Sequence, residues 1–127
     1  MSLDKNQNAE PELYSDKYVN IKYMRLFDQS SVSKGTLYLQ LKVTNTSNQA
    51  VTVLLTDTSV NKMSVQSGTA LPIKIEPGNM SVSPFILFAL NTGIVKAEEV
   101  NNIRFKLKMY DEKMNTIHET PMINLDL

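Results

Sequence analysis

Hydroxyl and amide side chains crowd residues 43–62, VTNTSNQAVTVLLTDTSVNK, and such groups could serve nucleophilic catalysis. A serine or threonine nucleophile needs a base beside it, and the chain has one histidine, His118. The sequence contains no G-x-S-x-G elbow, H-E-x-x-H zinc motif, phosphate loop or dinucleotide fingerprint. We therefore predict that the protein is not an enzyme, and that His118 is an exposed polar residue of a terminal strand.

Paired carboxylates are the next candidates for acid–base chemistry. The pairs Glu98–Glu99 and Asp111–Glu112 are adjacent in sequence, so their side chains diverge, whereas glycosidase carboxylates converge at about 5–9 Å. We expect a helix start and a hairpin tip instead. A calcium site would need several oxygen ligands from one loop, and no D-x-D-x-D-G run occurs. The remaining calcium alternative is that Asp57 meets Asp111 across loops.

Soft metal ligands gather near the C-terminus. Met109, Met114, His118 and Met122 lie within fourteen residues, and thioethers together with an imidazole suit Cu(I). Strand alternation sends Met109 inward, however, and methionine is an ordinary filler of apolar cores. We therefore expect no metal and no other cofactor, and we keep copper carriage as an alternative.

Two segments indicate the fold class. Residues 36–44, TLYLQLKVT, and residues 102–110, NIRFKLKMY, alternate between apolar and polar side chains, which is typical of half-buried β-strands. The side chains expected to face the core are Leu37, Leu39, Leu41, Val43, Ile103, Phe105, Leu107 and Met109.

Weaker strands fit around these two. They are expected at 18–27, where the alternation drifts as a β-bulge would cause, at 50–56 and at 82–89. The closing segment TIHETPMINLDL carries Pro121, which predicts an edge or a break between two short strands. Only residues 96–102 are typical of a helical turn. We predict an all-β fold, an immunoglobulin-like antiparallel β-sandwich of about eight short strands with at most one short helical turn.

The hydroxyl-rich segment gains a structural interpretation in this fold. Residues 45–48 predict the turn of a hairpin, because asparagine and serine side chains bond nearby backbone. Thr52 and Thr56 alternate with apolar residues and so belong on the solvent face of the following strand. Residues 57–61 have no predicted role of their own.

Domain boundaries follow from composition. Residues 1–16 are polar and are expected to form a flexible N-terminal leader or linker, whereas residues 17–127 form the β-sandwich domain. Met1, Ser2 and Leu3 are typical of an expression scar, so we expect that a native signal peptide or anchor is missing from this sequence.

Charge and cysteine content exclude several classes of function. The chain has 13 basic and 13 acidic residues, so we expect no nucleic-acid partner, and it has no cysteine for disulfides or thiolate metal sites. Arg104, Lys106 and Lys108, with Lys42, form an outward basic stripe that we interpret as a solvated strand face. The longest apolar runs, such as residues 85–90, are too short to span a bilayer, so we expect no membrane insertion of this domain.

The uncharged stretch PFILFAL, residues 84–90, is the strongest candidate for a partner surface. Its side chains are apolar on both faces, so we expect that the core and the following loop cover them, and we keep an exposed patch as the alternative. In the second case Phe85 or Phe88 would anchor a partner or a homodimer. Tyr38 and Tyr110 are expected to face outward; if their strands are neighbours, they would share a patch of the kind that binds glycans.

The order of several motifs resembles a known group of domains. "VTNTSNQAVTV", "DTSVN", "IEPGNMSV" and "GIVKAEEVNNIRFKLKMYDEKMNTI" follow one another as in immunoglobulin-like domains of unassigned function from exported proteins and lipoproteins of Gram-positive, mostly Firmicute, bacteria. The resemblance covers roughly residues 18–127. The chain departs from it at Asn61–Lys62, where the group commonly has Asn-Gly, and in its near-neutral charge.

The resemblance implies a cellular setting and the fold, and the group has no activity to transfer. We expect a secreted or cell-envelope-attached module, non-catalytic, that contacts a protein partner or acts as a spacer at the cell surface. The alternative is a carrier of a small ligand or metal, with copper or a glycan as cargo.

Overall fold

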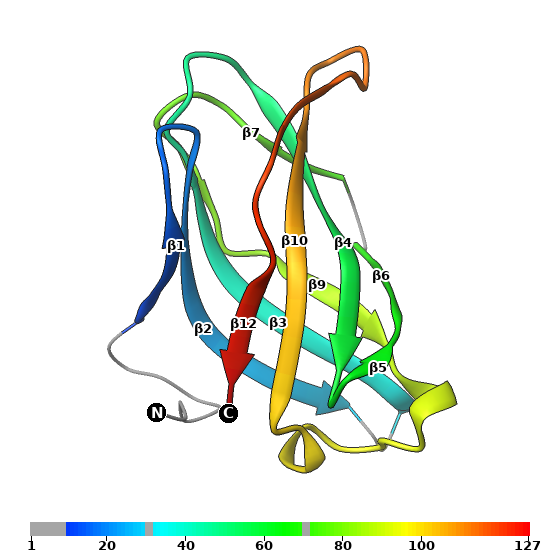
Figure 1. Cartoon of the computed structure of the whole chain (residues 1–127). Helices are drawn as coiled ribbons and strands as arrows, with labels where there is room; N and C mark the ends of the chain where they lie inside the picture. The colour runs from blue at the N-terminus through cyan, green and yellow to red at the C-terminus, as the bar shows by residue number, and fades with distance from the viewer. Residues whose placement is uncertain (1–9, 30–31, 70–71) are drawn as a thin grey trace.

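The computed structural model describes residues 10–29, 32–69 and 72–127, which form two antiparallel β-sheets packed face to face (Figure 1). The strands are β1 (Glu12–Ser15), β2 (Val19–Gln29), β3 (Ser33–Asn45), β4 (Val51–Val60), β5 (Met63–Ser64), β6 (Gln66–Gly68), β7 (Ile73–Ile75), β8 (Met80–Ser81), β9 (Pro84–Phe88), β10 (Asn102–Tyr110), β11 (Thr116–Glu119) and β12 (Ile123–Asp126).

The strand order is that of an immunoglobulin fold. One sheet runs β1-β2-β3-β9-β6, with β8 also paired to β3, and we call it the first sheet. The second sheet runs β11-β10-β4-β5, with β12 on β10 and β7 on β4. The sequences β2-β3-β9-β6 and β11-β10-β4 correspond to the A-B-E-D and G-F-C orders of immunoglobulin domains. The predicted antiparallel β-sandwich is therefore confirmed.

Two single turns of 3-10 helix interrupt the strands in the described part of the chain, one more than predicted. The turn η2 (Ala97–Glu99) lies inside the segment expected to be helical. The turn η1 (Leu90–Thr92) was not expected; it ends at Gly93, whose φ of 83° is a conformation that glycine adopts without strain. None of the described helical segments has the length and apolarity needed to cross a membrane.

The core lies between the sheets and takes its largest contributions from β3 and β10. Their inward side chains are fully buried, as the alternation predicts, and include Leu37, Leu39, Leu41, Ile103, Phe105, Leu107 and Met109. Each large side chain of this kind stabilises the fold by about 1.5–3 kcal/mol through its removal from water. The two periodic segments thus supply the central strand of each sheet.

A β-bulge in β2 explains the drift in its alternation. Tyr23 pairs with Leu41 and Arg25 pairs with Gln40, which leaves Met24 as the extra residue. Tyr23 is fully buried, and burial raises the pKa of its hydroxyl. Beyond the bulge the facing of the side chains reverses, so that Leu26 enters the core.

A second bulge gives residues 57–61 their role. Arg104 pairs with Ser59 and Lys106 with Thr56, so that Asp57 and Thr58 together oppose one residue of β10. Asp57 has a φ of 48° at this irregularity.

Asn61 then fastens the end of β4 to the start of β10. Its Nδ2 donates to the carbonyl of Glu99 at 3.0 Å, and its Oδ1 accepts the backbone N–H groups of Asn101 at 2.8 Å and Asn102 at 3.2 Å. The segment is structural: it aligns two core strands.

The domain begins earlier than the sequence indicates. Residues 1–9 of the expected leader lie outside the described residues, but Glu12–Ser15 form β1 and pair with β2. The expectation of a flexible leader up to residue 16 is therefore wrong for this part. Its polar composition misled because β1 is a short edge strand, with few side chains to bury.

Candidate functional site

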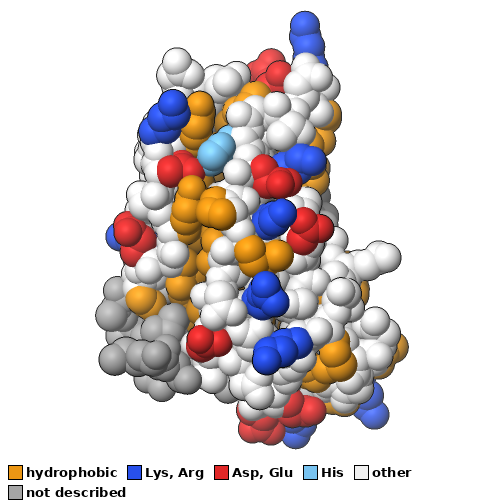
Figure 2. Space-filling model, in the orientation of Figure 1, with side chains coloured by type: hydrophobic (Ala, Val, Ile, Leu, Met, Phe, Trp, Pro, Cys, Tyr) orange, Lys and Arg blue, Asp and Glu red, His pale blue; other side chains and the backbone are white. Residues whose placement is uncertain are grey.

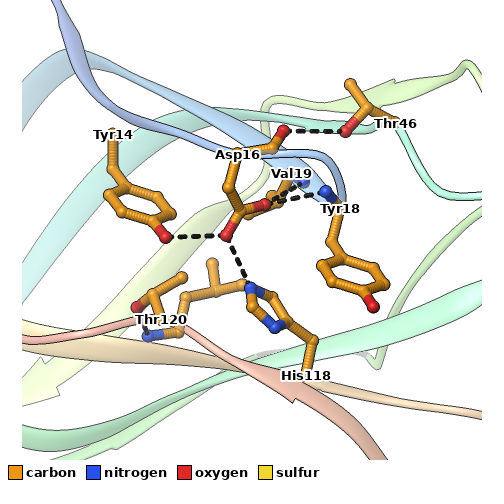
Figure 3. A network of polar contacts seen from close by, with 8 residues as sticks. Tyr14, Asp16, Tyr18, Val19, Thr46, His118 and Thr120 are labelled. Atoms are coloured by element: carbon orange, nitrogen blue, oxygen red, sulfur yellow. Dashed lines mark hydrogen bonds and ion pairs between the residues drawn. The ribbon is translucent and has the colours of Figure 1, made fainter.

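A polar cluster joins the two sheets where the β1–β2 turn meets β11 (Figure 3). The Oδ1 of Asp16 accepts the backbone N–H groups of Tyr18 at 2.7 Å and Val19 at 3.0 Å. Its Oδ2 accepts the hydroxyl of Tyr14 at 2.7 Å and lies 2.6 Å from Nε2 of His118. The rings of Tyr18 and His118 stack with their centroids 4.3 Å apart.

The cluster stabilises a carboxylate at Asp16. Partial burial raises the pKa of Asp16, but the hydrogen bonds from Tyr14, the backbone of Tyr18, His118 and the backbone of Val19 together outweigh it and hold the pKa below its usual value. The hydrogen bond from Tyr14 to Asp16, together with partial burial and the negative charge of Asp16, raises the pKa of the Tyr14 hydroxyl. All four partners favour the ionised form of Asp16.

The role that this cluster can serve is structural: its hydrogen bonds hold the two sheets together. Both oxygens of Asp16 are occupied, and the group that His118 meets is this carboxylate rather than a serine or threonine hydroxyl. The expectation that His118 is simply exposed is wrong, because its side chain is 20% exposed and is held between Asp16 and Tyr18. The partner was missed because it lies in the segment taken for a leader.

The four proposed soft-metal ligands do not gather at one place: Met109 and His118 are cross-strand partners of β10 and β11, but the other two lie elsewhere. Met109 is fully buried in the core, whereas Met114 is exposed at the tip of the β10–β11 hairpin. Met122 lines a surface hollow beside Arg104, away from both. Among the described residues no group of three or more His, Cys, Asp and Glu side chains could hold a metal ion.

The calcium alternative fails on separation. Tyr110, which precedes Asp111, pairs with Thr52, and Asp57 lies five residues further along β4, or roughly 17 Å at the rise of a strand. Asp111 instead accepts the N–H groups of Lys113 and Asn115, each at 2.9 Å, which closes its own hairpin.

The outer face of the second sheet carries interleaved charges (Figure 2). Lys106 lies 3.4 Å from Asp57 and 4.0 Å from Glu119, and Lys108 lies 4.0 Å from the other oxygen of Glu119. Exposed pairs of this kind contribute little to stability, about 0–1 kcal/mol each. Tyr110 sits on this face with the ammonium of Lys108 5.7 Å from its ring centre. These carboxylates partly neutralise Lys106 and Lys108, whereas Lys42, which was expected in the same basic stripe, lies on the first sheet and pairs with Glu10.

The outer face of the first sheet is different in character. Phe27, Tyr38, Ile86 and Gly68 occupy one cross-strand row through β2, β3, β9 and β6. The rings of Phe27 and Tyr38 stack 5.1 Å apart at 15°. The guanidinium carbon of Arg25 lies over the Phe27 ring, 4.2 Å from its centre.

We call Arg25, Phe27, Tyr38, Ile86 and Phe88 the aromatic face. Arg25 is held in place by a 2.9 Å hydrogen bond from its Nε to the side chain of Gln40. Sequence reasoning missed Phe27, because only the bulge at Met24 turns it outward; the drifting alternation was the available signal.

The four residues predicted to contact a partner lie in different parts of the structure. Phe85 is 1% exposed and belongs to the core, so the alternative that it anchors a partner fails for this residue. Phe88 is 49% exposed, because β9 sends alternate residues inward and outward. Tyr38 lies on the first sheet and Tyr110 on the second, so the two tyrosines do not share a patch.

Comparisons with known proteins give matches among solved structures. No protein family model matches it, and no curated protein matches it. Among solved structures, a FixG-related protein from Vibrio parahaemolyticus is similar to the chain, with 18% sequence identity and a TM-score of 0.45, over 88% of this chain and 97% of that one. The two chains are therefore comparable in extent and distant in sequence.

Proposed function

We propose that the protein is a non-catalytic β-sandwich module at the cell surface that binds a protein partner through the aromatic face. The observation that carries the proposal is the asymmetry between the two outer sheet surfaces. The second sheet carries ion pairs among Lys106, Lys108, Asp57 and Glu119. The first sheet, although Lys42 of β3 pairs with Glu10, presents the stacked aromatic and aliphatic side chains of the aromatic face.

The composition of the aromatic face is typical of an interface. Phenylalanine, tyrosine and arginine are enriched in protein contacts. The two aromatic side chains bury a large area with few rotatable bonds. Arg25 is already ordered by Gln40 and by the Phe27 ring, so less conformational entropy is lost on binding. The cell-surface location is supported by the resemblance of residues 18–127 to domains of exported Gram-positive proteins.

Site-specific photocrosslinking tests this function with a matched pair of tyrosines. Benzoylphenylalanine is introduced in place of Tyr38 on the first sheet, or in place of Tyr110 on the second, and each protein is irradiated with cell envelopes of a Firmicute. We expect discrete crosslinked bands with the Tyr38 variant that unlabelled protein competes away. Equal crosslinking from both positions, or none from Tyr38, would count against the proposal. A homodimer would give a product of twice 14.3 kDa.

A ligand carrier is the second candidate, and only its glycan form gains support. The uncharged hollow beside Phe88 favours a neutral saccharide. Met109, Met114 and Met122 lie in the core, at a hairpin tip and beside Arg104, which gives no such support to copper.

A further inference from the structure

A hollow of about 670 Å³ opens at the end of the first sheet, beside the aromatic face. It is formed where β6 approaches the turn η1 that follows β9. The residues that line it are Ser64, Val65, Gln66, Phe88, Leu90 and Asn91. Its volume falls in the range of small-molecule sites, about 300–1,000 Å³.

One residue that lines this hollow, which we call the Phe88 hollow, is the exposed aromatic side chain of Phe88. Gly68 lies diagonally across from Phe88, and a Cβ added to Gly68 would lie 3.4 Å from Cε2 of that ring. The ring therefore leans over the bare glycine backbone and remains 49% exposed. Leu90, 68% exposed, extends the apolar surface. A glycine at this place allows an aromatic side chain to lie along the sheet.

The walls of the Phe88 hollow carry polar groups that are available to a ligand. The side chains of Ser64, Gln66 and Asn91 make no hydrogen bond to another residue in the described part of the chain, in contrast to the amides of Asn45 and Asn61, which each bind backbone. None of the six lining residues carries a charge. An ionic ligand would lose hydration here without gaining an opposite charge, which is unfavourable.

We propose that the Phe88 hollow binds a neutral oligosaccharide. One face of a pyranose ring presents C–H groups, which pack on the electron-rich face of an aromatic ring. Its rim presents hydroxyls that both donate and accept, and the amides of Gln66 and Asn91 can do the same in return. The proposal goes beyond the protein contact through the aromatic face and does not depend on it: the two sites share Phe88, but the other residues that line the hollow lie outside the aromatic face.

Saturation-transfer NMR and calorimetry on the purified chain test the proposal with a panel of neutral gluco-, manno- and N-acetylglucosamine oligosaccharides. At least one series is expected to bind saturably, and Phe88→Ala is expected to weaken it at least tenfold. Phe88→Trp keeps an aromatic face for stacking and is expected to bind as the parent does. Gln66→Ala and Asn91→Ala are each expected to weaken binding severalfold. Tyr110→Ala, on the opposite outer face, is the matched control and binds as the parent does.

Three results would overturn the assignment: no saturable binding by any saccharide in the panel, binding that Phe88→Ala leaves unchanged, or equal loss with Tyr110→Ala. Circular dichroism of each variant shows whether it is folded, and Gln66→Ala provides an independent exposed position if Phe88→Ala misfolds. Because these measurements use pure sugars, their failure leaves the Tyr38 crosslinking result intact, and the reverse also holds.

Discussion

His118 Nε2 lies 2.6 Å from Asp16 Oδ2 across 102 residues of sequence, and this contact joins an edge of one sheet to an edge of the other. On the opposite side of the sandwich, β6 pairs with β9 while Ser67 Oγ donates to the carbonyl of Leu55 on β4 at 3.0 Å. Hydrogen bonds of side chains therefore bridge the two sheets on both sides of the sandwich.

We expect Asp16→Ala to reduce the free energy of unfolding by about 1–2 kcal/mol. The substitution leaves two backbone N–H groups, the Tyr14 hydroxyl and His118 without their common acceptor, and each is partly exposed, so water recovers some of the loss. Urea denaturation measures the change. Glu98→Ala, at an exposed position of η2, serves as the control and is expected to change stability by less than about 0.5 kcal/mol. A loss no larger than this control would mean that the bridge does not stabilise the fold.

The depressed pKa of Asp16 predicts how stability depends on pH. Its folded pKa lies below the unfolded value, so the unfolded chain binds the proton first as pH falls. The stabilisation is complete above the unfolded pKa, about 3.9, and is lost as pH falls through the folded pKa. Between about pH 5 and pH 2, urea midpoints of Asp16→Asn should therefore fall less steeply than those of the parent. Parallel slopes would contradict this assignment.

Sequence alone was sufficient where burial follows a local period. Leu39 and Leu107 could be assigned to the core because each strand alternates strictly, and this fixed the central strand of each sheet. Phe85 and Phe88 could not be told apart, since both faces of residues 84–88 are apolar and the register comes only from pairing with β3. Phe27 needed the bulge at Met24, which an individual sequence marks only as a drift.

The polar bridge was beyond sequence reasoning for a different reason. Asp16 follows a polar stretch that carries no periodic signal, and its partner is 102 residues away. The contact depends on how the edges of the two sheets approach each other, which is a property of the whole sandwich. The role of residues 57–61 was hidden in the same way, because Asn61 acts on the backbone of β10 rather than on its own neighbours.

Asn61 offers a test of that role. Its side chain satisfies three backbone groups, and its φ of 48° is unfavourable for most residues. Asn61→Ala loses both the bonds and the conformational tolerance, and should cost about 1–3 kcal/mol in urea denaturation. Asn61→Gly keeps the tolerance, so it should recover part of that cost. If Asn61→Gly were fully as stable as the parent, the three hydrogen bonds would contribute nothing.

Phe85 and Phe88 form a natural pair for testing which face of β9 the core uses. Phe85→Ala removes a buried ring and should lower the free energy of unfolding by about 3–5 kcal/mol, because a cavity remains between the sheets. Phe88→Ala removes a ring that already meets water, so its cost should be below about 1 kcal/mol. Comparable losses at the two positions would mean that the register of β9 on β3 is wrong. Phe85→Ala is therefore expected to affect mainly stability, and Phe88→Ala mainly ligand binding. The two substitutions distinguish a residue that stabilises the core from one that is exposed for binding.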